Sequence, residues 1–175
     1  MTPTGDPVGV RTQPAQPPDR PGGFFMGQPL RGKRVTELVI ALLNHPVVLV
    51  GAGGAVGSLL RYYIGRWVDA RVGGTGFPWG TFAVNVSGSF VLGVTALLVT
   101  ERLPPEYRSA YLLIGTGLCG GYTTFSTFEW ETFQLVRDGS LWLALANVAG
   151  SVAFGFLGIL LAVLAVYGLF GRPPT

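Results

Sequence analysis

Four long stretches without an acidic or basic side chain dominate this 175-residue sequence. They cover residues 38–60, 72–100, 109–128 and 139–171, and each is at least 20 residues long. A helix needs about 20 apolar residues to cross a bilayer. Only 12% of the residues are charged, against roughly 25% in an average soluble domain. We therefore expect an all-α membrane protein, and the composition disfavours a soluble enzyme, a secreted disulfide scaffold and a nucleic-acid-binding domain.

The chain divides into a tail and a membrane domain. Residues 1–34 hold seven of the 13 prolines and no long apolar run, which predicts a disordered Pro/Gly-rich tail. Residues 35–172 are then one four-helix membrane domain. His45-Pro46 indicates a break, with a short amphipathic helix before it, and the glycine-rich start of the second stretch indicates a loop. The predicted spans are 46–67, 79–100, 108–135 and 140–169. The single cysteine, Cys119, excludes an intrachain disulfide.

The distribution of basic side chains between the two ends of the spans hardly determines in which direction the chain inserts into the membrane. Four spans place both termini on one side, and outside the tail three basic residues lie on that side against four on the other. The first group is Arg102, Arg108 and Arg172, and the second is Arg61, Arg66, Arg71 and Arg137. Either the tail orients the chain weakly, or copies insert both ways and pair antiparallel. One four-helix chain is too small to enclose a pore, so we expect an oligomer in both cases.

Polar residues inside the spans are neutral. No Asp, Glu or Lys lies near the middle of a span, which disfavours proton-coupled transport. Thr81, Asn85 and Ser89 share one helix face, and Asn147 and Ser151 share another. Such groups often bond a carbonyl or help helices pack. They can also replace the water shell of a small anion without trapping it by full charge.

The third span, GTGLCGGYTTFSTFEWE from Gly115, is rich in glycine and threonine and predicts a broken helix at residues 120–123. The break is either a kink without a ligand, or a source of carbonyls for a cation and of a helix amino end for an anion. Phe125 and Phe128 face the same way, so their electropositive ring edges either meet a small anion or pack. Arg61 either snorkels to the interface or attracts anions into a vestibule.

Three strings, GAVGSLLRYYIG, WGTFAVNVSGSF and GLCGGYTTFSTFEWE, resemble the CrcB/Fluc fluoride channels, and the resemblance covers about residues 46–170. It implies a multi-pass protein of the bacterial plasma membrane, not an enzyme, that exports fluoride passively. It also implies an antiparallel, dual-topology homodimer with two pores, and a structural Na⁺ held by the carbonyls of Gly120 and Thr123. The implied partners are fluoride, a second copy and the lipid bilayer, with no nucleic acid. The implied fluoride path contains Arg61, Thr81, Asn85, Phe125, Ser126, Phe128, Glu131, Asn147 and Ser151.

The sequence departs from this family at a few positions. Asn147 stands where the fourth helix often has a tyrosine, and Gly155 replaces a hydroxyl residue one turn later. Glu129 and Trp130 replace small residues between the second phenylalanine and the glutamate.

Two other classes of membrane protein fit the sequence less well than a fluoride channel. A small dual-topology multidrug exporter needs a carboxylate in its first span, and residues 38–60 have none. A membrane scaffold explains glycine-rich packing faces but not the FSTF string beside a midspan break.

Overall fold

The computed structural model describes residues 34–172, and these residues contain helices and no strand. The predicted all-α class is confirmed for this part of the chain. The predicted tail, apart from Arg34, lies outside the described residues. In chain order the elements are α1 (Val35–Leu43), α2 (Pro46–Val72), α3 (Trp79–Leu97), η1 (Leu98–Arg102), η2 (Pro105–Tyr107), α4 (Arg108–Ala110), η3 (Tyr111–Cys119), α5 (Gly120–Tyr122), α6 (Phe125–Arg137) and α7 (Leu141–Phe170).

Within residues 34–172, three helices are long and apolar enough to cross a bilayer, judged by length and composition. They are Pro46–Val72, Trp79–Arg102 and Leu141–Phe170, of which the second joins α3 to η1. They cover the first, second and fourth predicted spans, and α2 continues five residues beyond its predicted end at residue 67. The start of α2 follows from its sequence, because His45 Nδ1 accepts the Val47 amide at 3.3 Å and Pro46 occupies the first turn.

The region predicted as the third span is assembled from shorter pieces. The turns of η3 are wide, of the π type, and α5 is a single turn. Thr123 and Thr124 then have extended backbone, with ψ angles of 158° and 121°, before α6 begins at Phe125. No single helix in this region of the described chain is among those long enough to cross a bilayer.

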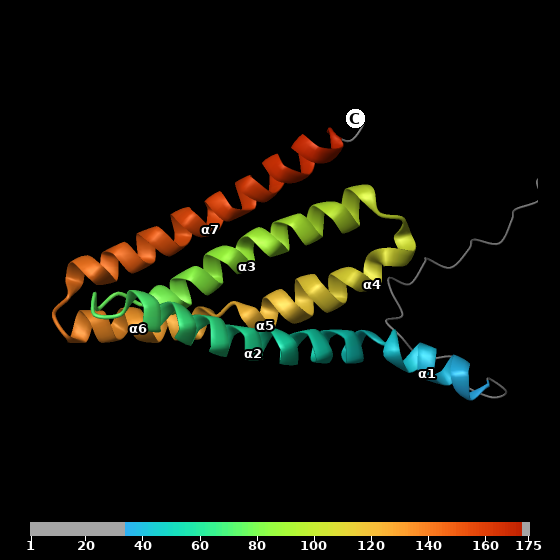
Figure 1. Ribbon diagram of the computed structural model, residues 1–175, viewed down its shortest axis with the longest axis horizontal. Coiled ribbons are helices and arrows are strands. Elements are labelled where there is room, and N and C mark those ends of the chain that lie inside the picture. Colours follow the sequence, from blue (N-terminus) through green and yellow to red (C-terminus); the bar gives the residue numbers. More distant parts are fainter. Residues whose placement is uncertain (1–33, 173–175) are drawn as a thin grey trace, which may run out of the picture. The chain divides into compact units, whose positions relative to one another are not determined.

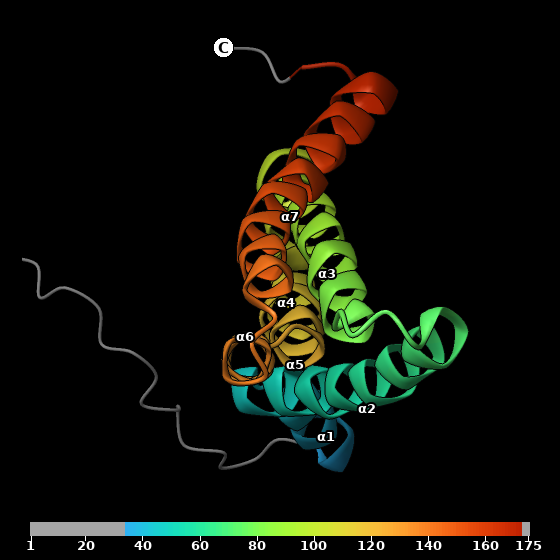
Figure 2. The same cartoon turned by 90° about the vertical axis from the view of Figure 1, so that its left-hand side faces the viewer.

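The segment from η3 to α5 lies against both α2 and α3, and α3 in turn packs along α7 (Figures 1 and 2). Glycines make the approach of α2 to η3 very close. A Cβ atom on Gly53 would overlap the carbonyl oxygen of Leu113, and one on Gly57 would overlap that of Leu118. Membrane helices associate through such backbone contacts because lipid tails are as apolar as the side chains they would replace.

A carboxylate joins the end of α2 to the start of α3. The Gly80 amide donates to Asp69 Oδ1 at 2.7 Å. A negative group at this position also interacts favourably with the positive end of the α3 dipole. A Cβ atom on Gly80 would overlap the Asp69 carboxylate and approach the Gly65 carbonyl oxygen. The contact therefore fixes the α2–α3 connection and requires glycine at residue 80.

We expect Gly57→Ala to lower the stability of the folded protein, because the added methyl group has to separate α2 from η3 and α5. Overpacking of this kind costs about 1–3 kcal/mol. Gly51→Ala, on the same helix, is the matched control, since its Cβ would meet no atom within 4 Å. Thermal unfolding of both variants in detergent measures the effect. Equal midpoints for the two variants would contradict the close packing described above.

Candidate functional site

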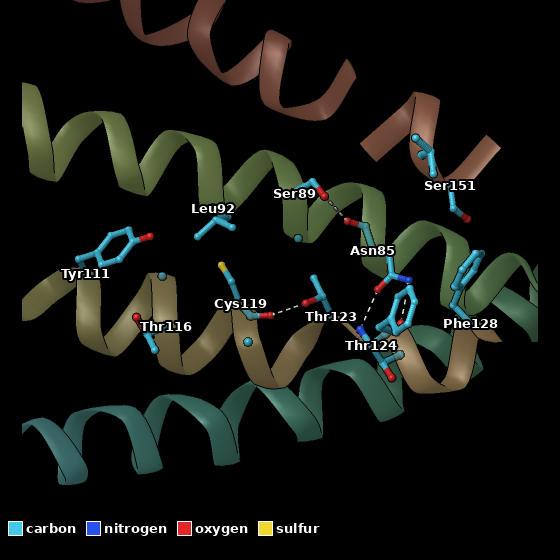
Figure 3. Close-up of a pocket in the computed structure, with 15 residues that line it drawn as sticks. Asn85, Ser89, Leu92, Tyr111, Thr116, Cys119, Thr123, Thr124, Phe128 and Ser151 are labelled. Atoms are coloured by element: carbon cyan, nitrogen blue, oxygen red, sulfur yellow. Dashed lines mark hydrogen bonds between the residues drawn. The ribbon is translucent and has the colours of Figure 1, made fainter. Parts of the chain in front are cut away.

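A cavity of about 510 Å³ lies beside the interruption between α5 and α6 (Figure 3). Residues from α3, η3, α5, α6 and α7 line it. No acidic or basic side chain is among them. Its polar lining consists of hydroxyl and amide side chains, which come from Asn85, Ser89, Tyr111, Thr116, Thr123, Thr124 and Ser151. Such a lining offers neutral hydrogen-bond donors in a largely apolar space.

Asn85 pairs with the backbone of Thr124 through two hydrogen bonds (Figure 3). The Thr124 amide donates to Asn85 Oδ1 at 2.8 Å, and Asn85 Nδ2 donates to the Thr124 carbonyl oxygen at 3.1 Å. The side-chain amide thus supplies one acceptor and one donor to extended backbone that has left the helix. The second N–H of the Asn85 amide has no hydrogen-bond partner within residues 34–172, and Asn85 is among the residues that line the cavity.

This pairing changes the backbone bonds of the preceding turn. In a continuous α-helix the amide of residue 124 would donate to the carbonyl of residue 120. Here Asn85 takes that amide, and within residues 34–172 no hydrogen bond reaches the carbonyl oxygen of Gly120 or Thr123. A Cβ atom on Gly120 would meet nothing within 4 Å, so this side of the backbone is open. Two backbone oxygens of the kind that coordinate Na⁺ at broken membrane helices are therefore free.

Residues of α3 close to Asn85 contact the end of α5, the single turn before the interruption. Ser87 Oγ and Tyr122 Oη are hydrogen-bonded at 2.9 Å. A Cβ atom on Gly88 would overlap the Thr123 methyl group, so glycine lets the interruption approach α3. Sequence periodicity does not predict this contact between Ser87 and Tyr122, because the bond joins residues that are 35 positions apart in different helices.

The two predicted phenylalanines are at the start of α6. Thr124 caps this helix, because its side chain accepts the Thr127 amide at 3.3 Å. The rings of Phe125 and Phe128 are 5.9 Å apart and tilted by 42°, and both line the cavity. Phe128 is 8% exposed, whereas Phe125 is 74% exposed in the single chain. The interruption thus sets the position of both rings, because α6 begins directly after it.

A second, smaller cavity of about 320 Å³ contains Arg61 and Thr81, together with Arg66 and Asp69. Thr124, at the interruption, lines both cavities. Thr81 Oγ1 donates to Glu131 Oε1 at 2.9 Å. The other oxygen of this carboxylate, Oε2, is buried and has no hydrogen-bond partner among the described residues. Arg61 and Thr81 thus share the smaller cavity, and Glu131 is attached to it through Thr81.

The remaining predicted residues are separated by the structure. Ser151 lines the large cavity, but Asn147, one turn before it on α7, is 1% exposed and lines neither cavity. Asn147 bonds Thr132, a residue that the sequence analysis did not identify. Thr132 is four residues after Phe128 on α6, and that spacing was the available signal. Ser126 lines a shallow hollow on the outer side of α6 with Phe125 and Glu129.

Comparison with known proteins places this geometry in a family. Residues 48–164 match the family described as CrcB-like protein, Camphor Resistance (CrcB). The chain belongs to the CrcB family. Three relatives named fluoride-specific ion channel FluC support this. The Solibacter usitatus protein is 49% identical over 112 residues, or 64% of this chain and 90% of the relative. The Chlorobaculum tepidum protein is 51% identical over 124 residues, which are 67% of this chain and 94% of the relative. The Thermus thermophilus protein is 47% identical over 118 residues, which are 67% of this chain and 87% of the relative.

Membership of the CrcB family confirms the resemblance derived from the three sequence strings. As a CrcB protein with three apolar helices long enough to cross a bilayer, the chain is an integral membrane protein, as predicted. The family consists of ion channels and not of enzymes, which also agrees with the prediction. The matched segment contains every residue of the two cavities.

We expect Asn85→Leu to destabilise this CrcB protein by about 2–4 kcal/mol, because it leaves the amide and carbonyl of Thr124 unpaired at membrane depth. Ser89→Ala is the matched control on the same face of α3, since the Ser89 hydroxyl only donates to the Asn85 carbonyl oxygen of its own helix. Unfolding in mixed micelles measures both. An Asn85→Leu variant as stable as Ser89→Ala would contradict a structural role for the paired hydrogen bonds.

Proposed function

We propose that this CrcB protein is a fluoride-selective channel that exports fluoride passively across the plasma membrane and so lowers cytoplasmic fluoride. The observation that carries the proposal is the cavity at the interruption, whose lining consists of neutral donors, apolar groups and two phenylalanine rings. The names of the FluC relatives support the choice of fluoride among small anions. Fluoride is strongly hydrated, so a path for it has to replace water by other hydrogen-bond donors.

The proposed path begins at the smaller cavity. The Arg61 guanidinium attracts the anion, which then passes the interruption at Thr124, a residue common to both cavities. In the larger cavity the remaining Asn85 N–H and the Ser151 hydroxyl replace part of the water shell. The ring edges of Phe125 and Phe128 carry partial positive charge and add weak contacts. Neutral groups bind the ion weakly enough to release it, which a full positive charge at this depth would prevent.

We further propose that two copies assemble as an antiparallel, dual-topology homodimer with two pores. In the single chain Phe125 is 74% exposed although it lines the cavity, so the cavity wall is incomplete. A second copy in the opposite orientation would supply the missing wall. The nearly balanced basic residues at the two ends of the spans favour insertion in both orientations.

A structural Na⁺ at the centre of this dimer is the third part of the proposal. The carbonyl oxygens of Gly120 and Thr123 fit such an ion, since no hydrogen bond within residues 34–172 uses them and the side of Gly120 is open. Bound there, Na⁺ would supply positive charge that compensates these carbonyl dipoles and holds the interrupted segments together. Asn85 keeps the Gly120 oxygen free by retaining the Thr124 amide.

The test is fluoride efflux from liposomes that contain the purified protein, measured with a fluoride electrode. We expect rapid, uncoupled efflux that Phe125→Ile and Phe128→Ile each reduce by at least tenfold, because an aliphatic side chain has no electropositive edge. Phe154→Ile is the matched control, since this ring packs edge-to-face against Phe82, with the ring centroids 5.7 Å apart, on the α3–α7 face outside the cavity. Absence of fluoride efflux, or equal rates for all three variants, would overturn the proposed function.

Sodium is tested by thermal unfolding in NaCl and in choline chloride at equal ionic strength. We expect a saturable rise of the unfolding temperature with Na⁺, because a ligand bound only by the folded state stabilises it by about 2.7 kcal/mol at 100 times its Kd. Asn85→Leu should weaken the rise, since it removes the two hydrogen bonds that hold the extended Thr124 backbone beside the Gly120 oxygen. Unfolding temperatures that do not depend on Na⁺ would remove the sodium site and leave the fluoride path standing.

A further inference from the structure

Asn147 is a polar side chain in an apolar part of α7 that the proposed path does not explain. It is 1% exposed and is one of the two largest fully buried side chains among the described residues. Burying an amide without partners is costly, so its partners indicate its role. Asn147 Nδ2 donates to Thr132 Oγ1 at 2.9 Å, and Asn147 Oδ1 accepts a longer bond of 3.4 Å from Ser151 Oγ.

These bonds form a chain with one direction. The single hydroxyl proton of Thr132 goes to the Phe128 carbonyl oxygen at 2.8 Å, so Thr132 can only accept from Asn147. The chain therefore runs from the cavity-lining Ser151 through Asn147 and Thr132 and ends at the backbone of Phe128. Its last member is the residue whose ring, together with that of Phe125, lines the cavity.

The chain also crosses between two helices. Within residues 34–172, one side-chain hydrogen bond connects α6 to α7, and it is the bond from Asn147 to Thr132. One other, from Thr81 to Glu131, connects α3 to α6. The backbone before α6 is extended, so the preceding helix does not fix the rotation of α6 about its own axis. Side-chain hydrogen bonds between membrane helices favour one relative placement of the two helices.

We propose that Asn147 is a positioning residue that acts through Thr132 to hold α6, and with it the Phe128 ring, at the cavity wall. This role rests on the proposed fluoride function. It differs from the role that the family resemblance implies, in which Asn147 itself contacts the ion. Asn147 is 1% exposed and lines neither cavity, so its amide lies outside the cavity walls that form the proposed path. Ser151 keeps its place in the cavity wall.

The test is a double-mutant cycle on fluoride efflux with Asn147→Leu, Thr132→Val and the double variant. We expect each single variant to slow efflux by roughly tenfold, equivalent to about 1.4 kcal/mol. The double variant should be no slower than either single variant, because both remove the same contact. Thr132→Ser keeps the hydroxyl and should stay within about twofold of the wild-type rate. If Asn147→Leu does not fold, Asn147→Ser replaces it, since its side chain is too short to reach Thr132.

Thr95→Val is the matched control for Thr132→Val. Like Thr132, Thr95 donates its hydroxyl proton to the carbonyl four residues earlier, that of Val91, but within residues 34–172 it accepts no hydrogen bond from another helix. Its efflux should equal that of the wild type. Single effects that multiply in the double variant would show that Asn147 contributes independently of Thr132, and would overturn the positioning role. A slow Thr132→Ser variant, or single variants with wild-type rates, would overturn it as well. Absence of efflux from the wild-type protein would instead overturn the fluoride function and with it this role.

Discussion

The paired hydrogen bonds between Asn85 and the backbone of Thr124 are the interaction on which the rest of the site depends. Lipid offers no partner to a backbone amide or carbonyl, so a helix can be interrupted at membrane depth only where protein groups replace the lost bonds. Asn85 replaces them at both the amide and the carbonyl of one residue, Thr124. The Gly120 carbonyl becomes free as a direct result, and a new helix, α6, begins one residue later with the two phenylalanines in its first turn.

Much of this arrangement could be predicted from the sequence because its causes are local. The uncharged stretches indicated helices long enough to cross a bilayer, and three helices of that kind are present in the described residues. His45-Pro46 indicated where α2 begins, because proline is tolerated only in the first turn of a helix. The spacing of Thr81, Asn85 and Ser89 placed them on one face of α3, and Asn85 and Ser89 indeed line the same cavity.

The rest could not be predicted because it depends on contacts between helices. Asn147 and Ser151 have the spacing of one helix face, yet only Ser151 reaches the cavity, since Thr132 of α6 covers Asn147. The bond between Ser87 and Tyr122 leaves no periodic signal in either segment. Hydropathy describes residues 109–128 as one apolar run, but it does not register that the Thr124 amide finds a side-chain partner and ends the helix.

The carboxylate of Asp69 has a consequence for ion selection. Helix amino ends attract anions, and a free one at the mouth of an anion path would retain fluoride at the entrance. The amide of Gly80 at the start of α3 already has an anion of its own, supplied by the end of α2. In the proposed channel this tethered carboxylate would occupy a position that a permeating anion could otherwise take. In the proposed fluoride path, ions that enter beside Arg61 would find this amino end occupied and would move on toward the amino end of α6.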